Sequence, residues 1–204
     1  MSGALGQESE GATPLTEQEL EGLRLAWVTT KADLNRAEAE NILRARAKLQ
    51  RTRRRRLFWY LDQSGLQALH KEMFGEVWNW AGTLRRRETN LGVDPVQIAV
   101  MLHDLREDVL AQVGDGKDTV YPIAELAVRF HHRLVAIHPF ANGNGRHARL
   151  AAELLLADLG GSGLTWGGGG ELVRISQLRT EYLIALRRAD HGEFGALIEF
   201  AARP

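Results

Sequence analysis

The residues best suited to chemistry are gathered between positions 138 and 149. This stretch reads His-Pro-Phe-Ala-Asn-Gly-Asn-Gly-Arg-His-Ala-Arg and lies between two apolar segments. Gly143 and Gly145 can adopt positive φ and leave backbone N–H groups unobstructed. A helix that follows them adds its own N-terminal donors at the same place. The stretch therefore predicts a nest for an anion, phosphate above all.

Three side chains extend this predicted anion site. Arg146 and Arg149 are three residues apart, so both can face the same side of the first helical turns. Two guanidinium groups above a phosphate nest indicate a polyphosphate rather than a lone anion. His138, at the rim, is a candidate general base. Each feature alone is more often a plain turn or a solvated residue, and their joint occurrence favours phosphate chemistry.

The composition limits the classes of protein to which the chain can belong. It has 204 residues, about one domain, with 26 basic and 26 acidic residues, and this balance argues against a generally basic nucleic-acid binder. The absence of Cys excludes disulfide scaffolds, zinc–thiolate sites and Cys nucleophiles. We see no signal peptide, and no apolar run approaches the roughly 18 residues of a membrane span, so we expect a cytoplasmic protein.

Helical periodicity dominates the segments that must position the site. Residues 82–93 and 160–170 have no such period: the first is a candidate hairpin or loop, and the second holds seven glycines around Trp166 as its expected anchor. The sequence therefore predicts an all-α fold with at most a small β element. Cap signals and apolar spacing predict helices beginning near Thr16, Thr30, Ser64, Asp94, Pro122, Leu150, Leu178 and Phe194.

Two other clusters invite a different reading. Residues 41–61 carry eight bases and no acid, with Arg51–Arg56 at their centre, but a charge run is more often a solvated face, so we expect no nucleic-acid binding. His131 and His132 are adjacent, point about 100° apart on a helix and cannot share a metal. We expect His131 to line a wall of the site and His147 to be exposed.

The stretch 138–149 resembles the signature of the Fic domain family, His-Pro-Phe-x-(Asp/Glu)-Gly-Asn-Gly-Arg-x-x-Arg. Further matches at residues 69–82, 166–186 and near the N-terminus extend the resemblance to roughly residues 13–202 and to the subgroup called mobile mystery protein B. The resemblance implies an all-α Fic-domain helical fold with a small β-hairpin flap. It divides the chain into an N-terminal helical segment, 1–50, with a candidate regulatory role, and a Fic domain, 51–204. The flap would lie at about 83–93.

The resemblance also implies an activity. Fic proteins are mostly protein adenylyltransferases, which move AMP from ATP to a Ser, Thr or Tyr hydroxyl of a target protein, in some cases their own. A separate antitoxin-like inhibitor and a homodimer are further partners that we consider. The roles carried over are deprotonation of the hydroxyl by His138, anchoring of the loop by Phe140, phosphate binding by Gly143, Asn144 and Gly145, and binding of the β- and γ-phosphates by Arg146 and Arg149.

One position departs from the family pattern. Asn142 stands where the family usually has Asp or Glu, which holds Mg²⁺, and an amide oxygen is a weaker ligand for a hard cation. We expect ATP as substrate, with Mg²⁺ or Mn²⁺ held only weakly by Asn142. Two alternatives stay open: an ATP-binding regulatory module with weak or no transferase activity, or a transferase that uses another phosphate-containing donor.

Two regulatory features follow from the same resemblance. Many Fic proteins carry an inhibitory helix whose Glu pairs with the second Arg of the motif. Glu40, followed by Asn41, is the candidate here, and its expected partner is Arg149, although Arg36 stands where the pattern has Ser or Thr. Family flaps align the target segment by main-chain pairing. We therefore expect Arg86, Arg87 and Thr89 to lie near the incoming target.

Overall fold

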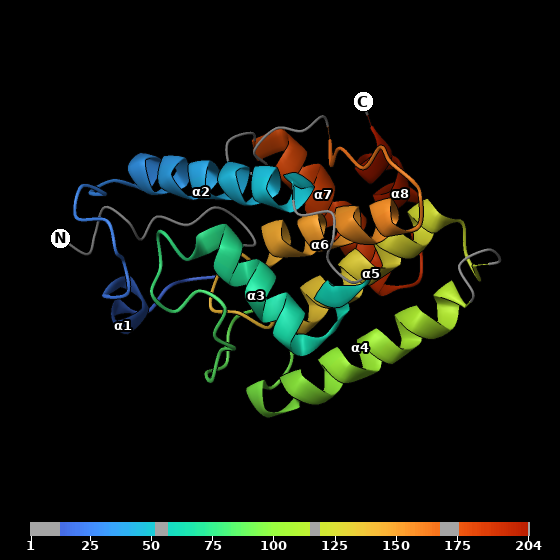
Figure 1. Cartoon of the computed structure of the whole chain (residues 1–204), viewed down its shortest axis with the longest axis horizontal. Helices are drawn as coiled ribbons and strands as arrows, with labels where there is room; N and C mark the ends of the chain where they lie inside the picture. Colours follow the sequence, from blue (N-terminus) through green and yellow to red (C-terminus); the bar gives the residue numbers. More distant parts are fainter. Residues whose placement is uncertain (1–12, 52–56, 115–118, 168–175, 204) are drawn as a thin grey trace.

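The computed structural model describes residues 13–51, 57–114, 119–167 and 176–203, and these form a helical fold (Figure 1). Within these ranges the β structure consists of isolated antiparallel bridges, Leu23 with Trp78 and Leu84 with Phe140. The all-α prediction is confirmed. The helices are α1 (Glu17–Leu20), α2 (Lys31–Arg51), α3 (Gln63–Phe74), α4 (Ile98–Val113), α5 (Ile123–Ile137), α6 (Asn144–Asp158), α7 (Ser176–Asp190) and α8 (Gly195–Ala202), with 3-10 turns η2 (Trp59–Leu61) and η3 (Pro95–Gln97).

Helix α6 lies at the centre of the arrangement, with α5 packed along it (Figure 1). Helix α3 contacts both α6 and α2, α4 covers the outer side of α5, and α8 contacts α5 and α7. The apolar faces of these helices meet in one core, in which Leu69, Met73 and Leu155 are fully buried. The site motif between α5 and α6 is thus built into the most buried pair of helices.

Three segment starts follow the cap signals of the sequence, whereas Ser64 and Leu150, expected as helix starts, lie inside α3 and α6. Thr16 and Glu19 form a reciprocal capping box at α1. At α2, Thr30 Oγ1 accepts from the Asp33 N–H at 3.1 Å, and the Asp33 carboxylate accepts from the Thr30 N–H at 3.1 Å. Asp94 caps η3 by accepting from Val96 N–H. These contacts fix the entry of each segment and position α2 beside the site.

The loop between α5 and α6 is strongly constrained. Helix α5 ends at His138, which adopts the left-handed conformation (φ 54°, ψ 60°), and Gly143 (φ 78°) begins α6. A Cβ at Gly143 would lie 2.7 Å from the Phe74 ring, so only glycine fits there. Asn144 closes the loop, since its side chain accepts from Phe140 N–H at 2.9 Å and donates to Phe140 O at 2.8 Å. Phe140 is fully buried, which matches its predicted anchoring position.

Residues 83–93 do not form the expected hairpin. Their backbone is irregular apart from the single bridge at Leu84. The reason is Arg85, which is 5% exposed and donates to the carbonyls of His138 (2.6 Å) and Arg87 (2.9 Å) and to that of Val93. The guanidinium also donates to the Ile137 carbonyl at 3.4 Å, and these four bonds hold the segment against the end of α5 and the loop that follows it.

His147 is fully buried, so the expectation that it is exposed is wrong. Its Nε2 bonds to the Leu66 carbonyl at 3.0 Å, which ties α6 to α3. The buried His70 similarly donates to the Asn142 carbonyl at 3.0 Å and accepts from the Gly82 N–H at 3.0 Å. Both histidines therefore serve to hold elements together around the site.

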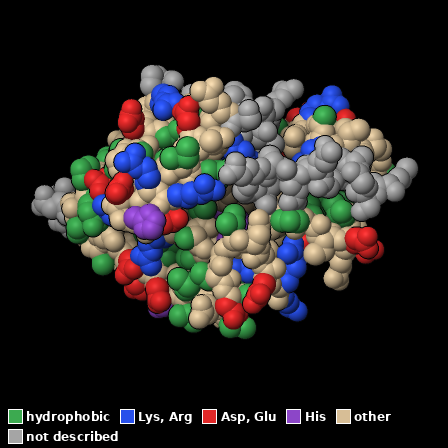
Figure 2. Space-filling model, turned by 180° about the vertical axis from the view of Figure 1, so that it is seen from behind, with side chains coloured by type: hydrophobic (Ala, Val, Ile, Leu, Met, Phe, Trp, Pro, Cys, Tyr) green, Lys and Arg blue, Asp and Glu red, His purple; other side chains and the backbone are tan. Residues whose placement is uncertain are grey.

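The basic run of residues 41–61 is only partly within the described ranges, since 52–56 lie outside them. Where it is described, Arg46 pairs with Glu153 at 2.5 Å, Lys48 pairs with Glu72 at 2.6 Å, and Arg44 pairs with Glu76. On the face shown in Figure 2, basic and acidic side chains are intermixed. In the described part of the chain, no helix combines the length and the apolar character that a membrane crossing requires.

Candidate active site

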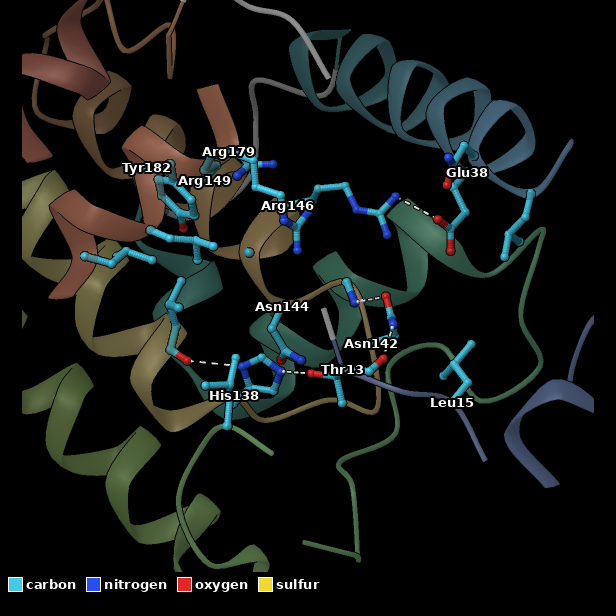
Figure 3. A pocket seen from close by; sticks show the side chains of 18 of the residues that line it. Thr13, Leu15, Glu38, His138, Asn142, Asn144, Arg146, Arg149, Arg179 and Tyr182 are labelled. Atoms are coloured by element: carbon cyan, nitrogen blue, oxygen red, sulfur yellow. Dashed lines mark hydrogen bonds and ion pairs between the residues drawn. The ribbon is translucent and has the colours of Figure 1, made fainter. Parts of the chain in front are cut away.

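The stretch 138–149 opens on a pocket of about 160 Å³. The pocket is bounded by the N-terminal segment, the first turns of α2, the α5–α6 loop, the start of α6, and α7 (Figure 3). Its polar and charged lining is Thr13, Lys31, Asn35, Glu38, His138, Asn142, Asn144, Arg146, Arg149, Arg179 and Tyr182, with Gly143 and Gly145. The structure therefore brings together every catalytic, phosphate-binding and metal candidate that the motif predicted.

The start of α6 forms one end of the pocket, the end at which the sequence predicts an anion. Gly143 adopts positive φ as expected, whereas Gly145 lies within helix α6, so the expectation for Gly145 is wrong. Gly145 matters through the absence of a side chain: a Cβ there would find its nearest neighbours, Arg149 Nη1 and Tyr182 Oη, 3.9 Å away. This leaves space beside the first free N–H groups of α6, where a phosphate can approach the backbone closely.

Asn144 differs from its predicted role, because its side-chain amide is used to hold the loop at Phe140. Only the backbone N–H of Asn144, in the first turn of α6, is placed where a helix offers donors to an anion.

Arg149 lies deep in the pocket, against α7. Its guanidinium carbon is 5.6 Å from the centroid of the Tyr182 ring. The Tyr182 hydroxyl in turn is 2.8 Å from His131 Nε2, so a hydrogen bond between α5 and α7 holds the ring against which Arg149 lies. Burial lowers the pKa of the Arg149 guanidinium, and burial of a cation favours binding of an anion beside it. His131 is thus a buried support of the site rather than part of its wall.

Arg146 is held by an acid of α2. Its Nη1 donates to Glu38 Oε2 at 2.7 Å, and the Glu38 side chain is 6% exposed (Figure 3). Glu38 Oε1 accepts from Trp78 Nε1–H at 2.7 Å. Glu40 is exposed on another face of α2, so the expected pairing of Glu40 with Arg149 is wrong. The residue that faces the motif is Glu38, and its partner is the first arginine.

His138 has a defined tautomer. Its Nδ1 is 3.3 Å from the Val135 carbonyl, which can only accept, so Nδ1 carries the proton. Burial lowers the pKa of His138 to about 4, which keeps the imidazole neutral at pH 7. Nε2 therefore presents its lone pair to the pocket, where Thr13 Oγ1 lies 2.8 Å away. This is the arrangement that a general base for a hydroxyl requires.

Asn142 does not fit a protein-held Mg²⁺ site. Its Oδ1 accepts from Gly143 N–H at 2.6 Å, and its Nδ2 donates to the Thr13 carbonyl at 3.0 Å. Across the described ranges, no group of three or more His, Cys, Asp or Glu could hold a metal ion. The described residues around the pocket therefore do not supply the oxygen donors expected for a hard cation.

The candidate target-facing residues lie beside the pocket rather than in it. Arg86 is exposed. Arg87 donates to both carboxylate oxygens of Glu19, at 2.9 and 2.7 Å, and to the Pro14 carbonyl at 2.7 Å. Thr89 Oγ1 donates to the Leu91 carbonyl. Arg87 thus binds the N-terminal segment of its own chain, and the contact of these residues with a target stays a prediction.

Sequence reasoning missed the roles of Glu38 and Thr13. The signal for Glu38 was present, because Leu34, Ala37, Asn41 and Ala45 bury one face of α2 and an acid four residues after Leu34 falls on that face. No comparable signal exists for Thr13, since its position depends on how a segment before α1 crosses the fold.

Comparison with known proteins agrees with this geometry. Residues 60–156 match the family model described as Fic/DOC family. "Protein adenylyltransferase Fic" of Nematostella vectensis is 37% identical over 86 residues, 42% of this chain and 18% of that protein. "Protein adenylyltransferase fic-1" of Caenorhabditis elegans is 27% identical over 124 residues, 60% of this chain and 23% of that protein. The chain thus spans less than a quarter of the length of either relative.

Among solved structures, the N-terminal Fic domain of a Bartonella effector protein, from Bartonella sp. AR 15-3, superposes with a TM-score of 0.68. The match covers 93% of this chain and 94% of that one at 19% identity, so it shows a shared fold. The family match includes His138, Asn142 and Arg149, the residues around which the pocket is built. Residues 60–156 of the chain are therefore similar to the Fic/DOC family.

Proposed function

We propose that this chain is a protein adenylyltransferase that transfers AMP from ATP to a hydroxyl side chain of a protein. The observation that carries the proposal is the position of His138 Nε2, a neutral base facing a hydroxyl in the same pocket as Arg146, Arg149 and the start of α6. The names of the related proteins support the same activity.

The pocket supplies what transfer of a nucleotidyl group needs. The N–H groups at the start of α6 and the two guanidinium groups offer donors to a triphosphate, and they neutralise charge that develops on the leaving pyrophosphate. His138 Nε2 takes the proton of the attacking hydroxyl. The oxygen then bonds to the α-phosphorus as the bond from that phosphorus to the bridging oxygen breaks. Orientation and charge neutralisation, rather than a covalent enzyme intermediate, account for the rate.

Arg149 is better placed than Arg146 to bind phosphate in the structure as it stands. Tyr182 and His131 fix its orientation, and the open space at Gly145 lies directly beside it. Arg146 is already paired with Glu38 through Nη1, so part of its donor capacity and its charge is engaged before phosphate binds. We therefore assign the initial hold on the triphosphate to Arg149 and the start of α6, and a later contact to Arg146.

A divalent cation, Mg²⁺ or Mn²⁺, would enter with the nucleotide and be held by its phosphates. When bound, such an ion supplies charge neutralisation. The target is a protein with a Ser, Thr or Tyr hydroxyl. A separate antitoxin-like inhibitor, a homodimer and a cytoplasmic location stay predictions of the sequence analysis.

The test is intact-protein mass spectrometry of the full chain, and of bacterial lysate proteins, after incubation with ATP and Mg²⁺ or Mn²⁺. Wild type should add the mass of AMP to itself or to a lysate protein. His138→Ala should lose the adduct while it still binds ATP, because removal of a general base lowers the rate by roughly 10²–10⁴-fold. The matched control is His103→Ala on exposed α4, which should behave as wild type.

Asn142 favours one second candidate, an ATP-binding module without transferase activity. The amide already bonds to Gly143 N–H and to the Thr13 carbonyl, so it offers little to a cation. This candidate predicts ATP binding by wild type with no AMP adduct on any protein, with either metal ion.

A further inference from the structure

The segment before α1 lies across the pocket in the manner of a bound chain. Thr13 is 5% exposed, and its side chain and that of His138 point toward one another (Figure 3). The Thr13 carbonyl accepts from Asn142 Nδ2 at 3.0 Å, and the Pro14 carbonyl accepts from Arg87 Nη2 at 2.7 Å. Side chains of the motif and of residues 83–93 thus hold the main chain at Thr13 and directly after it.

The hydrogen bond between Thr13 and His138 has a direction. Because His138 Nδ1–H donates to the Val135 carbonyl, Nε2 accepts, and the Thr13 hydroxyl donates its proton to Nε2 over 2.8 Å. The hydroxyl oxygen therefore keeps its lone pairs for another partner. It occupies the position that an acceptor hydroxyl must take when a neutral histidine removes its proton.

Thr16, the next threonine of the segment, differs from Thr13 in its exposure and in its hydrogen bond. Thr16 is exposed, and its hydroxyl accepts from Glu19 N–H at 3.2 Å as the cap of α1. That cap, with the ion pair between Glu19 and Arg87 at 2.7 Å, anchors the chain directly after Thr13. The geometry therefore selects one hydroxyl of the segment, and the rest of the segment serves to position it.

From these contacts we infer that Thr13 is an acceptor of AMP within its own chain. This inference rests on the proposed function. The Thr13 oxygen attacks the α-phosphorus of ATP, and its proton passes to His138 Nε2. A phosphorus–oxygen bond to Thr13 forms, the bond between the α-phosphorus and the bridging oxygen breaks, and pyrophosphate leaves. The product is an AMP–threonine ester at residue 13, with His138 protonated until it returns its proton to water.

The modification changes the site itself. Thr13 bearing AMP can no longer donate to His138, and the added group is too large for the 5% exposed position that the hydroxyl fills. The segment must then leave the pocket, which frees His138 and Asn142 together. Modification of Thr13 thus precedes entry of a hydroxyl from another protein.

The test is peptide mapping by tandem mass spectrometry of the full chain after incubation with ATP and Mg²⁺ or Mn²⁺. Thr13→Val removes the hydroxyl and keeps the shape, Thr13→Ser keeps the hydroxyl, and Thr29→Val is the control at an exposed threonine away from the pocket. Melting curves establish that each variant is folded. AMP is expected at residue 13 in wild type, in Thr13→Ser and in Thr29→Val. No AMP is expected at residue 13 in Thr13→Val.

Transfer within one chain also has a kinetic signature. The fraction of Thr13 modified at a fixed time should not change when the protein is diluted. A His138→Ala chain, distinguishable by mass, should stay unmodified at Thr13 when mixed with active wild-type protein. Dependence on dilution, or modification of the His138→Ala chain at Thr13, would overturn transfer within the chain.

The outcomes separate this inference from the proposed function. Labelling of lysate proteins that depends on His138, with Thr13 never modified, overturns the inference and leaves the function standing. The same holds if Thr13→Val labels lysate proteins faster than wild type while no chain carries AMP at Thr13, since Thr13 would then be a blocking group only. Absence of AMP from every protein in every variant removes both.

Discussion

The Glu38 carboxylate lies 2.7 Å from the Arg146 guanidinium, so an acid of α2 neutralises one of the two cations of the phosphate site. The Glu38 side chain is 6% exposed and also accepts from Trp78 Nε1–H, which fixes it in place. A polyphosphate that uses Arg146 competes with this ion pair and approaches a buried negative charge. We therefore expect the pair to oppose nucleotide binding and to restrain activity.

Replacement of Glu38 by Gln should strengthen nucleotide binding. Gln keeps the size of the side chain and an oxygen for Trp78, but it removes the negative charge that competes for Arg146. We expect the Kd for ATP to fall by about tenfold, the equivalent of roughly 1.4 kcal/mol, with a faster AMP transfer. Isothermal titration calorimetry measures the affinity. The matched control is Glu40→Gln, two residues away and exposed, which should bind as wild type; equal effects of both substitutions would contradict the account.

Arg85 should be essential for stability rather than for recognition of a target. Arg85→Met leaves the carbonyls of His138, Arg87 and Val93 without their donor inside the fold. Loss of these bonds should lower the free energy of unfolding by about 2–4 kcal/mol, seen as a lower Tm in a thermal melt. Arg86→Met at the exposed neighbour should leave Tm unchanged. If the two variants melt alike, Arg85 does not hold residues 83–93 in the way described.

These two arginines show where sequence reasoning stops. The capping box at Thr16, the cap at Thr30 and the Pro139 signal for the end of α5 are local, and each is found where the sequence placed it. Whether an arginine in an irregular segment is buried depends on carbonyls far away in the chain. The carbonyl of residue 138 is 53 positions from Arg85, and no periodicity in residues 83–93 encodes that contact.

Stability should fall as the pH is lowered from about 6.5. Burial lowers the pKa of His131 to about 3 and of His147 to about 4, against an ordinary value near 6.5 in the unfolded chain. Between these values the unfolded state binds more protons than the native state, so stability is fully present above pH 6.5 and is lost as the pH falls toward 4. Thermal melts across pH 4 to 8 measure this loss.

Two substitutions test whether the buried histidines cause this pH dependence of stability. His147→Gln removes one buried titrating group, so its Tm should depend less steeply on pH than that of wild type, whatever its stability at neutral pH. His103→Gln, at an exposed position of α4, should follow the wild-type curve. A wild-type Tm that stays constant from pH 7 to pH 4.5 would refute the assignment of neutral, buried histidines.

Asn142→Asp should place a carboxylate for a metal ion at a position where wild type has an amide. A carboxylate adds a hard oxygen donor and removes the amide N–H that holds the Thr13 carbonyl. Titration with Mn²⁺ alone, without nucleotide, should give measurable binding for Asn142→Asp and little for wild type. Asn142→Ala is the control, since it loses the bond to Thr13 without gaining a carboxylate. If wild type binds Mn²⁺ as tightly as Asn142→Asp does, the conclusion that Asn142 does not hold a metal ion is wrong.

The site could be predicted in part. The motif places His138, Arg146 and Arg149 in one pocket because they share a loop and the first turns of one helix, which are local facts of the sequence. The partners of these residues come from distant segments: Glu38 is 108 positions from Arg146, and Thr13 is 125 positions from His138. The acid of α2 was expected one helical face away, at Glu40, because the family pattern was followed instead of the burial pattern of the helix.

The most direct measurement compares two forms of labelled ATP under identical conditions, one labelled in the α-phosphate and one in the γ-phosphate. The account predicts that protein becomes labelled by the α-phosphate, and that the γ-phosphate is released in pyrophosphate. His138→Ala should lose the α-label, and His103→Ala should keep it. Transfer of the γ-label to protein would contradict the assignment of this pocket to AMP transfer. ATP that binds to the protein but keeps both its α-label and its γ-label would contradict it as well.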